Sequence, residues 1–76
     1  MRTFIVFRDN YITQNRSLEM IKRSTLQELL DVKGIDYGEK DSEEEAVKYI
    51  DNYNGDGDNY WMIYEICLEE FKLIVS

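Results

Sequence analysis

The chain has 76 residues, of which 43% are hydrophobic, and it carries sixteen Asp and Glu against nine Lys and Arg, a net charge of −7. This length leaves room for one domain with one small core, and the apolar fraction is too high for a disordered chain. The isoelectric point of about 4.4 argues against direct binding of nucleic acid, because contacts with phosphates need Lys and Arg. A single cysteine excludes an intrachain disulfide.

The first residues are briefly apolar, but Arg8 interrupts them too early for a secretory signal or a membrane span. The lone cysteine favours a reducing compartment. We therefore expect a cytoplasmic protein without a membrane partner.

Residues 2–8 predict a first strand, with Phe4 and Val6 on one side and Ile5 and Phe7 on the other. Apolar residues on both sides predict a strand that is covered on both faces. The two polar residues that follow are expected to end this strand.

Residues 11–17 are mostly polar and lack periodicity, and they predict a loop, such as the turn of a long hairpin. Residues 18–23 are ambiguous. Leu18 and Met20 alternate as in a strand, while Leu18 and Ile21 are three apart as in a helix. We favour a strand, because the start signal of a helix lies immediately downstream.

Two helices are predicted in the middle of the chain. The first spans residues 25–33, starts with a capping box from Ser24 or from Thr25, and ends at Gly34. A second capping box starts the other helix at Ser42. The residues expected on the two buried stripes are Leu26, Leu29 and Leu30, then Ala46, Tyr49, Ile50 and Tyr53.

Residues 59–67 form the longest apolar and aromatic run, and they predict a central strand that is buried on much of both faces. Turn residues precede this run, and a turn at residues 68–70 leads into a last strand at residues 71–75. The predicted fold is α+β, a single domain over residues 1–76. It has a small antiparallel sheet of three or four strands and two short helices packed on one face.

Charge is divided unequally along the chain, with a net of +2 for residues 1–35 and −9 for residues 36–76. Carboxylates on a helix and its flanking loops can imitate phosphates towards a basic cleft. The alternative is a solvated helix face with ordinary capping acids. The predicted partner-binding residues are Glu39, Asp41, Glu43, Glu44, Glu45, Asp51, Asp56 and Asp58, together with the loop tyrosines Tyr11 and Tyr37.

The loop at residues 52–58 partly fits a calcium site, with oxygen side chains at its first, third and fifth positions and Gly57 at its sixth. The twelfth position, however, is Ile63 in place of a bidentate Glu, and a strand follows in place of a helix. Turn formation is the plainer interpretation. Calcium binding remains a third functional alternative, and no metal ligands are assigned.

The residues that catalysis commonly uses are scarce. The chain has no histidine, which excludes His-dependent triads and His-ligated metals. Cys67 has no neighbouring base or cation in the sequence and is interpreted as a buried structural thiol. The acids beside Gly55 and Gly57 would repel a phosphate. We expect a protein that is not an enzyme and has no cofactor.

In composition, the chain resembles the small inhibitors that bacteriophages make against host nucleic-acid enzymes, among them anti-CRISPR proteins and DNA mimics. The resemblance rests on shortness, acidity and the absence of proline and histidine, and it carries over no site. It implies a binding protein that inhibits or modulates a basic, nucleic-acid-handling protein. The alternative is a self-associating assembly module, a homodimer in which an exposed edge strand pairs across a two-fold axis.

Overall fold

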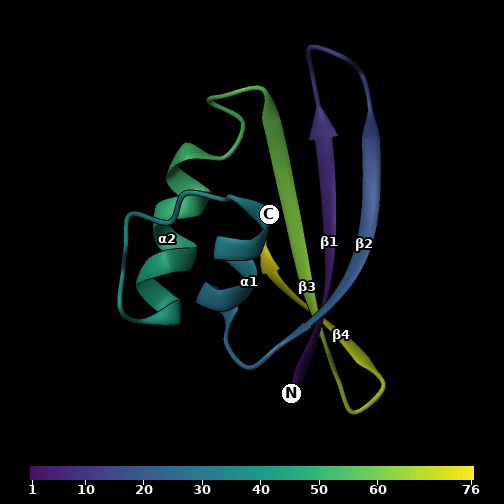
Figure 1. Cartoon of the computed structure of the whole chain (residues 1–76), viewed down its shortest axis with the longest axis vertical. Helices are drawn as coiled ribbons and strands as arrows, with labels where there is room; N and C mark the ends of the chain where they lie inside the picture. Colours follow the sequence, from purple (N-terminus) through teal and green to yellow (C-terminus); the bar gives the residue numbers. More distant parts are fainter.

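Two antiparallel hairpins build a four-stranded sheet, and the segment between the hairpins forms two helices (Figure 1). In the computed structural model, which describes residues 1–76, both helices lie on one face of the sheet. The predicted α+β fold is therefore confirmed. The elements are β1 (Arg2–Asn10), β2 (Arg16–Arg23), α1 (Leu26–Lys33), α2 (Glu43–Tyr53), β3 (Asn59–Cys67) and β4 (Glu70–Val75).

The strands follow the order β2-β1-β3-β4, so that β1 and β3 are interior and β2 and β4 are edges. The ambiguous residues 18–23 belong to β2, as predicted. The first strand does not end where we expected, because Asp9 and Asn10 pair with β3. Ladder hydrogen bonds use backbone groups, so polar side chains at the end of a strand do not prevent them.

The hairpin of β3 and β4 turns at Leu68 and Glu69, which have positive φ angles of 47° and 68°. These positions of a two-residue hairpin turn favour Asn and Gly. β4 begins one residue earlier than predicted. A bulge in the β3–β4 pairing leaves Ile74 without a partner, and such bulges bend an edge strand.

Both ends of α1 are set by local signals. The Thr25 hydroxyl accepts a hydrogen bond from the Glu28 amide at 3.1 Å, so the cap is Thr25 and not Ser24. Gly34 ends the helix with a φ of 69°. The next amide, that of Ile35, donates to the Leu30 carbonyl at 2.9 Å, and this turn folds the Ile35 side chain back into the core.

The Ser42 hydroxyl accepts a hydrogen bond from the Glu45 amide at 3.1 Å and starts α2 as predicted. Ala46 and Ile50 are buried, but Tyr53 is 56% exposed, so its predicted place in the buried stripe is wrong. A groove separates the last turn of α2 from the sheet. The Tyr53 ring packs instead on the half-buried ring of Tyr49, with 4.8 Å between the ring centroids.

The core lies between the helices and one face of the sheet, and its eleven buried residues are all apolar. Phe4 and Val6 of β1 belong to it, whereas Phe7 is 42% exposed on the opposite face. The prediction that β1 and β3 are covered on both faces is wrong. Two helices, each about 10 Å wide, can cover only one face of strands spaced about 4.8 Å apart. None of the helices has the length and apolarity needed to cross a membrane.

Candidate functional site

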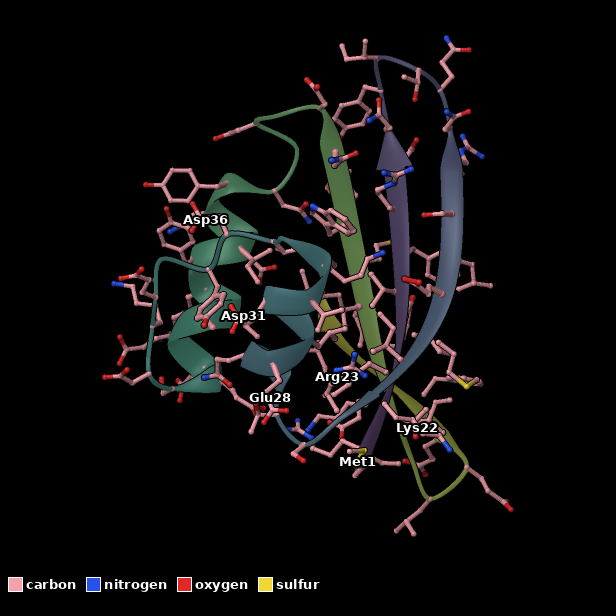
Figure 2. All side chains as sticks on the ribbon, viewed as in Figure 1. Met1, Lys22, Arg23, Glu28, Asp31 and Asp36 are labelled. Atoms are coloured by element: carbon pink, nitrogen blue, oxygen red, sulfur yellow. The ribbon has the colours of Figure 1, made fainter.

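The charge of the protein is divided between its two layers. The helical layer, residues 24–58, holds eleven of the sixteen carboxylates and three of the nine cations, a formal charge of −8. The sheet layer, residues 1–23 and 59–76, holds five carboxylates and six cations, a formal charge of +1. Figure 2 shows Asp31 and Asp36 among the helices and Lys22 on the side of the strands away from them. The imbalance along the sequence is therefore an imbalance between layers.

Most acids of the helical layer are exposed and form no ion pair. Only Glu43, with Arg2, and Glu44, with Lys48 at 3.6 Å, are paired. The other nine are all exposed, and we call them the acidic surface. Their field reaches into solvent over about a Debye length, about 8 Å at physiological salt. The acidic surface consists of Glu28, Asp31, Asp36, Glu39, Asp41, Glu45, Asp51, Asp56 and Asp58.

A groove of about 380 Å³ opens within the acidic surface. Asp36 lines it from the loop after α1, and Asp56 and Asp58 line it from the loop before β3. The Tyr49 hydroxyl donates a hydrogen bond to Asp36 at 3.2 Å, and desolvation and the Asp36 charge raise the pKa of Tyr49. Carboxylates beside aromatic rings are surroundings that suit an Arg or Lys side chain. The aromatic residues of the groove are Tyr49, Tyr53 and Trp61.

Asn54 and Gly55 give the loop before β3 its shape. The Asn54 carboxamide accepts a hydrogen bond from the Trp61 amide and donates one to the Trp61 carbonyl, both at 2.8 Å. Gly55 has a φ of 87°, and the Tyr11 hydroxyl lies where a side chain would project. The Asn54 oxygen, a ligand in the calcium alternative, is therefore used by the backbone. No group of three or more His, Cys, Asp or Glu side chains is placed to hold a metal.

Glu43 is partly buried and is bound to the sheet by an ion pair with Arg2, unlike the other predicted partner-binding acids. Arg2 donates hydrogen bonds to both oxygens of Glu43 and to both oxygens of Glu65. The Leu26 amide also donates to Glu43, at 3.2 Å. Hydrogen bonds from Arg2 lower the pKa of both carboxyl groups, and the two carboxylates raise the pKa of Arg2. Glu43 therefore joins the helices to the sheet.

The two loop tyrosines differ in exposure. Tyr11 is 47% exposed, and its amide donates a hydrogen bond to the Asp58 carbonyl at 2.9 Å, so it adjoins the groove loop. Tyr37 is half-buried against the core, and desolvation and the Asp31 carboxylate raise its pKa. Tyr11 is the better placed of the two for a partner. Cys67, predicted to be buried, is only half-buried at the end of β3.

The face of the sheet opposite the helices is apolar and uncovered. The antiparallel register sets its side chains in rows, such as Leu18, Phe7 and Met62 across β2, β1 and β3. Sequence reasoning missed this surface because apolar residues on both sides of a strand were taken to mean that both faces of the sheet are covered. The number of available helices was the signal that could have revealed it. We define the open face as Ile5, Phe7, Leu18, Met20, Met62, Tyr64, Ile66, Phe71 and Leu73.

All eight predicted carboxylates lie on the helical layer, and six of them belong to the acidic surface. Glu28, Asp31 and Asp36 were missed, because the prediction followed one run of acids. In the structure α1 packs beside α2 and adds Glu28 and Asp31, and the loop after α1 adds Asp36, which contacts Tyr49 of α2. Comparison of the chain with protein-family models, curated proteins and solved structures finds no match.

Proposed function

We propose that this is a non-enzymatic binding protein that presents its acidic surface to a basic surface of a nucleic-acid-handling protein, and so inhibits or modulates that partner. The observation that carries the proposal is the segregation of charge, −8 on the helical layer against +1 on the sheet layer. A partner that binds phosphates offers the complementary charge. Carboxylates that occupy its cleft exclude nucleic acid from it.

Ordinary helix capping accounts for only some of these acids. Glu28 and Glu45 lie in the first turns of their helices, where the helix dipole favours negative charge. Asp51 lies towards the other end of α2, whose last turn has no basic residue, and the dipole disfavours it there. Asp56 and Asp58 lie in a loop. Asp51 accepts a hydrogen bond from the Ser76 amide at 3.5 Å, whereas Asp56 and Asp58 form no ion pair. Loop acids of this kind support a role in association.

The groove supplies a point of specificity within the acidic surface. A long-range field accelerates encounter with a basic partner but does not fix its orientation. An Arg side chain that enters the groove meets Asp36, Asp56 and Asp58 at its charged end and aromatic rings along its plane. We expect the strongest contacts with the partner here.

The alternative of self-association through an edge strand has less support. β2 carries four charged residues in eight, and β4 is short and bulged. Charges and bulges are the features by which proteins keep an edge strand from pairing. Neither edge of the sheet therefore favours pairing with another copy.

The test of the proposed function is capture of proteins from an extract of the source cells on the immobilised chain, followed by mass spectrometry. At low salt the wild-type protein is expected to retain basic, nucleic-acid-binding proteins. It should release them at about 1 M salt, where the screening length is about 3 Å. The triple variant Asp36→Asn, Asp56→Asn, Asp58→Asn should lose most of this capture.

The matched control removes three charges from the sheet layer, by Asp9→Asn, Glu19→Gln and Glu70→Gln. It changes the net charge by the same amount and should retain the captured proteins. Equal losses in the two variants, or capture that salt does not weaken, would contradict the proposal.

A further inference from the structure

The open face is the largest feature that the proposed function leaves unused. Five of its side chains are between 42% and 66% exposed, on three different strands. A hollow of about 380 Å³ has no charged residue in its wall and is lined by Ile5, Phe7, Leu18, Tyr64 and Phe71. Contiguous apolar surface of this kind marks a site of association.

The extent of the open face sets the affinity to expect. Nine side chains, on strands about 4.8 Å apart and in rows about 6.7 Å apart, give a footprint of roughly 300 Å². This lies within the range of the largest apolar patches on monomers, about 300–600 Å², which are often functional. Two such faces with their rims would bury on the order of 1,000 Å² in total, less than the about 1,600 Å² of a standard interface. An interface of this size lies at the low end of the range for specific complexes, so we expect a weak, reversible complex.

We propose that a second copy of the chain covers the open face with its own open face, in a two-fold dimer whose layers run helix, sheet, sheet, helix. The charge of the sheet layer permits this occupant. The sheet layer has a formal charge of only +1, so two such layers approach without strong repulsion. The acidic surfaces then lie on opposite outer sides, beyond two sheets about 10 Å apart, and salt screens them from each other.

Complementary charges on opposite edges of the sheet specify the arrangement. Lys22 projects from β2 in the row of Thr3 and Ile66, near the N-terminal end of β1 (Figure 2). Glu69 lies in the β3–β4 turn at the same end of the sheet. Both are exposed, and neither has an ion pair within the chain. Glu69 has a φ of 68°, a backbone conformation that favours glycine, yet the residue at this position carries a charged side chain.

A two-fold axis parallel to the strands places β2 of one copy over β4 of the other. Each Lys22 then faces Glu69 of the second copy, and the pair occurs twice in the dimer. Apolar side chains pack between the two sheets as in a β-sandwich. The proposal does not depend on the binding of a basic partner, because it uses the other side of the molecule.

Sedimentation equilibrium from about 1 µM to about 1 mM tests the proposal over the concentrations at which a weak dimer forms. The wild-type protein should pass from monomer to dimer. Leu18→Glu and Phe71→Glu should each weaken the dimer at least tenfold, because they bury a charge in an apolar interface. Both side chains are more than 60% exposed, so far-ultraviolet circular dichroism should remain unchanged. Val32→Glu, at an exposed apolar position of α1, should leave the dimer intact.

Charge exchange tests the orientation. Lys22→Glu and Glu69→Lys should each weaken the dimer about fivefold or more, and the double variant should restore most of the loss. The dimer should persist at 1 M salt, whereas capture of a basic partner should be lost. The two proposals can therefore be tested independently of each other. A monomer at 1 mM, a dimer unaffected by Leu18→Glu and Phe71→Glu, or a wild-type open face that binds only other proteins or lipid would overturn the inference.

Discussion

The two faces of the sheet have similar apolar side chains but opposite surroundings. Phe4 and Phe7 both belong to β1, yet Phe4 is fully buried beneath the helices and Phe7 is 42% exposed. The difference comes from residues 24–58, which form a cover for one face only and carry most of the negative charge. Burial and charge are therefore set by the same segment. One side of the protein is acidic and the other is apolar.

The largest expected effect is a difference in unfolding free energy between variants on the two faces of the sheet. Phe4→Ala should cost about 3–5 kcal/mol, because it leaves a cavity in the core. Such a loss is comparable with the whole free energy of unfolding of a small domain, about 5 kcal/mol. Phe7→Ala should cost about 1 kcal/mol or less, since its side chain is already partly in water. Urea unfolding at micromolar concentration measures both, with Phe4→Leu as a milder core variant. Similar losses for Phe4→Ala and Phe7→Ala would contradict the assignment of faces.

The next largest loss of stability is expected when the contact between the layers at Arg2 is removed. Arg2→Met leaves the carboxylates of Glu43 and Glu65 without their cation and should cost about 1.5–3 kcal/mol. Arg16→Met is the control, because Arg16 lies 3.8 Å from Asp9 and its side chain is 83% exposed. It should cost less than about 0.5 kcal/mol. Equal effects would show that Arg2 does not join the layers.

Acid should remove the contribution of Arg2. The pKa values of Glu43 and Glu65 are lowered in the folded protein by hydrogen bonds from Arg2. The stability that these groups contribute is present above the ordinary Glu pKa of about 4.3 and is lost as the pH falls through their folded-state pKa values. The difference in unfolding free energy between wild type and Arg2→Met should be constant from pH 7 to about pH 5 and shrink below about pH 4. A difference that grows on acidification would contradict this assignment.

The loop beside the groove provides a smaller effect. Asn54→Ala removes both hydrogen bonds to the backbone of Trp61 and should cost about 1–2 kcal/mol. Asn52→Ala, at an exposed position without such bonds, is the control. Because Asn54 serves the backbone, millimolar calcium should leave the thermal melt of the wild-type protein unchanged. A rise in melting temperature with calcium would favour the calcium alternative.

The smallest expected effects have opposite signs at the two ends of α2. Asp51→Asn should stabilise the protein by a few tenths of a kcal/mol, because it removes a negative charge near the unfavourable end of the helix dipole. Glu45→Gln should destabilise it by a similar amount, since the first turn favours a carboxylate. Thermal melts at low salt resolve such shifts. Equal signs for the two variants would mean that another interaction dominates.

The elements of the fold could be predicted because their signals are local. Capping residues start both helices, Gly34 ends the first, and alternation marks β2 where periodicity alone is ambiguous. Local signals could not predict which faces of the sheet are covered, because this depends on how many helices are available to pack on them. The structural role of Glu43 was hidden for a related reason. Its partner, Arg2, is 41 positions away in the sequence, and only the packing of α2 on the sheet brings them together.

The proposed binding function depends most on the acidic surface acting as a single field. Titration of the ¹⁵N-labelled protein with an arginine-rich peptide at low salt, followed by amide chemical shifts, tests this directly. We predict shifts confined to residues 24–58 and to the residues beside the groove, Tyr11, Asn59 and Trp61, strongest around Asp36, Asp56 and Asp58, and abolished at high salt. Shifts spread over both layers, or concentrated on the open face, would contradict the account.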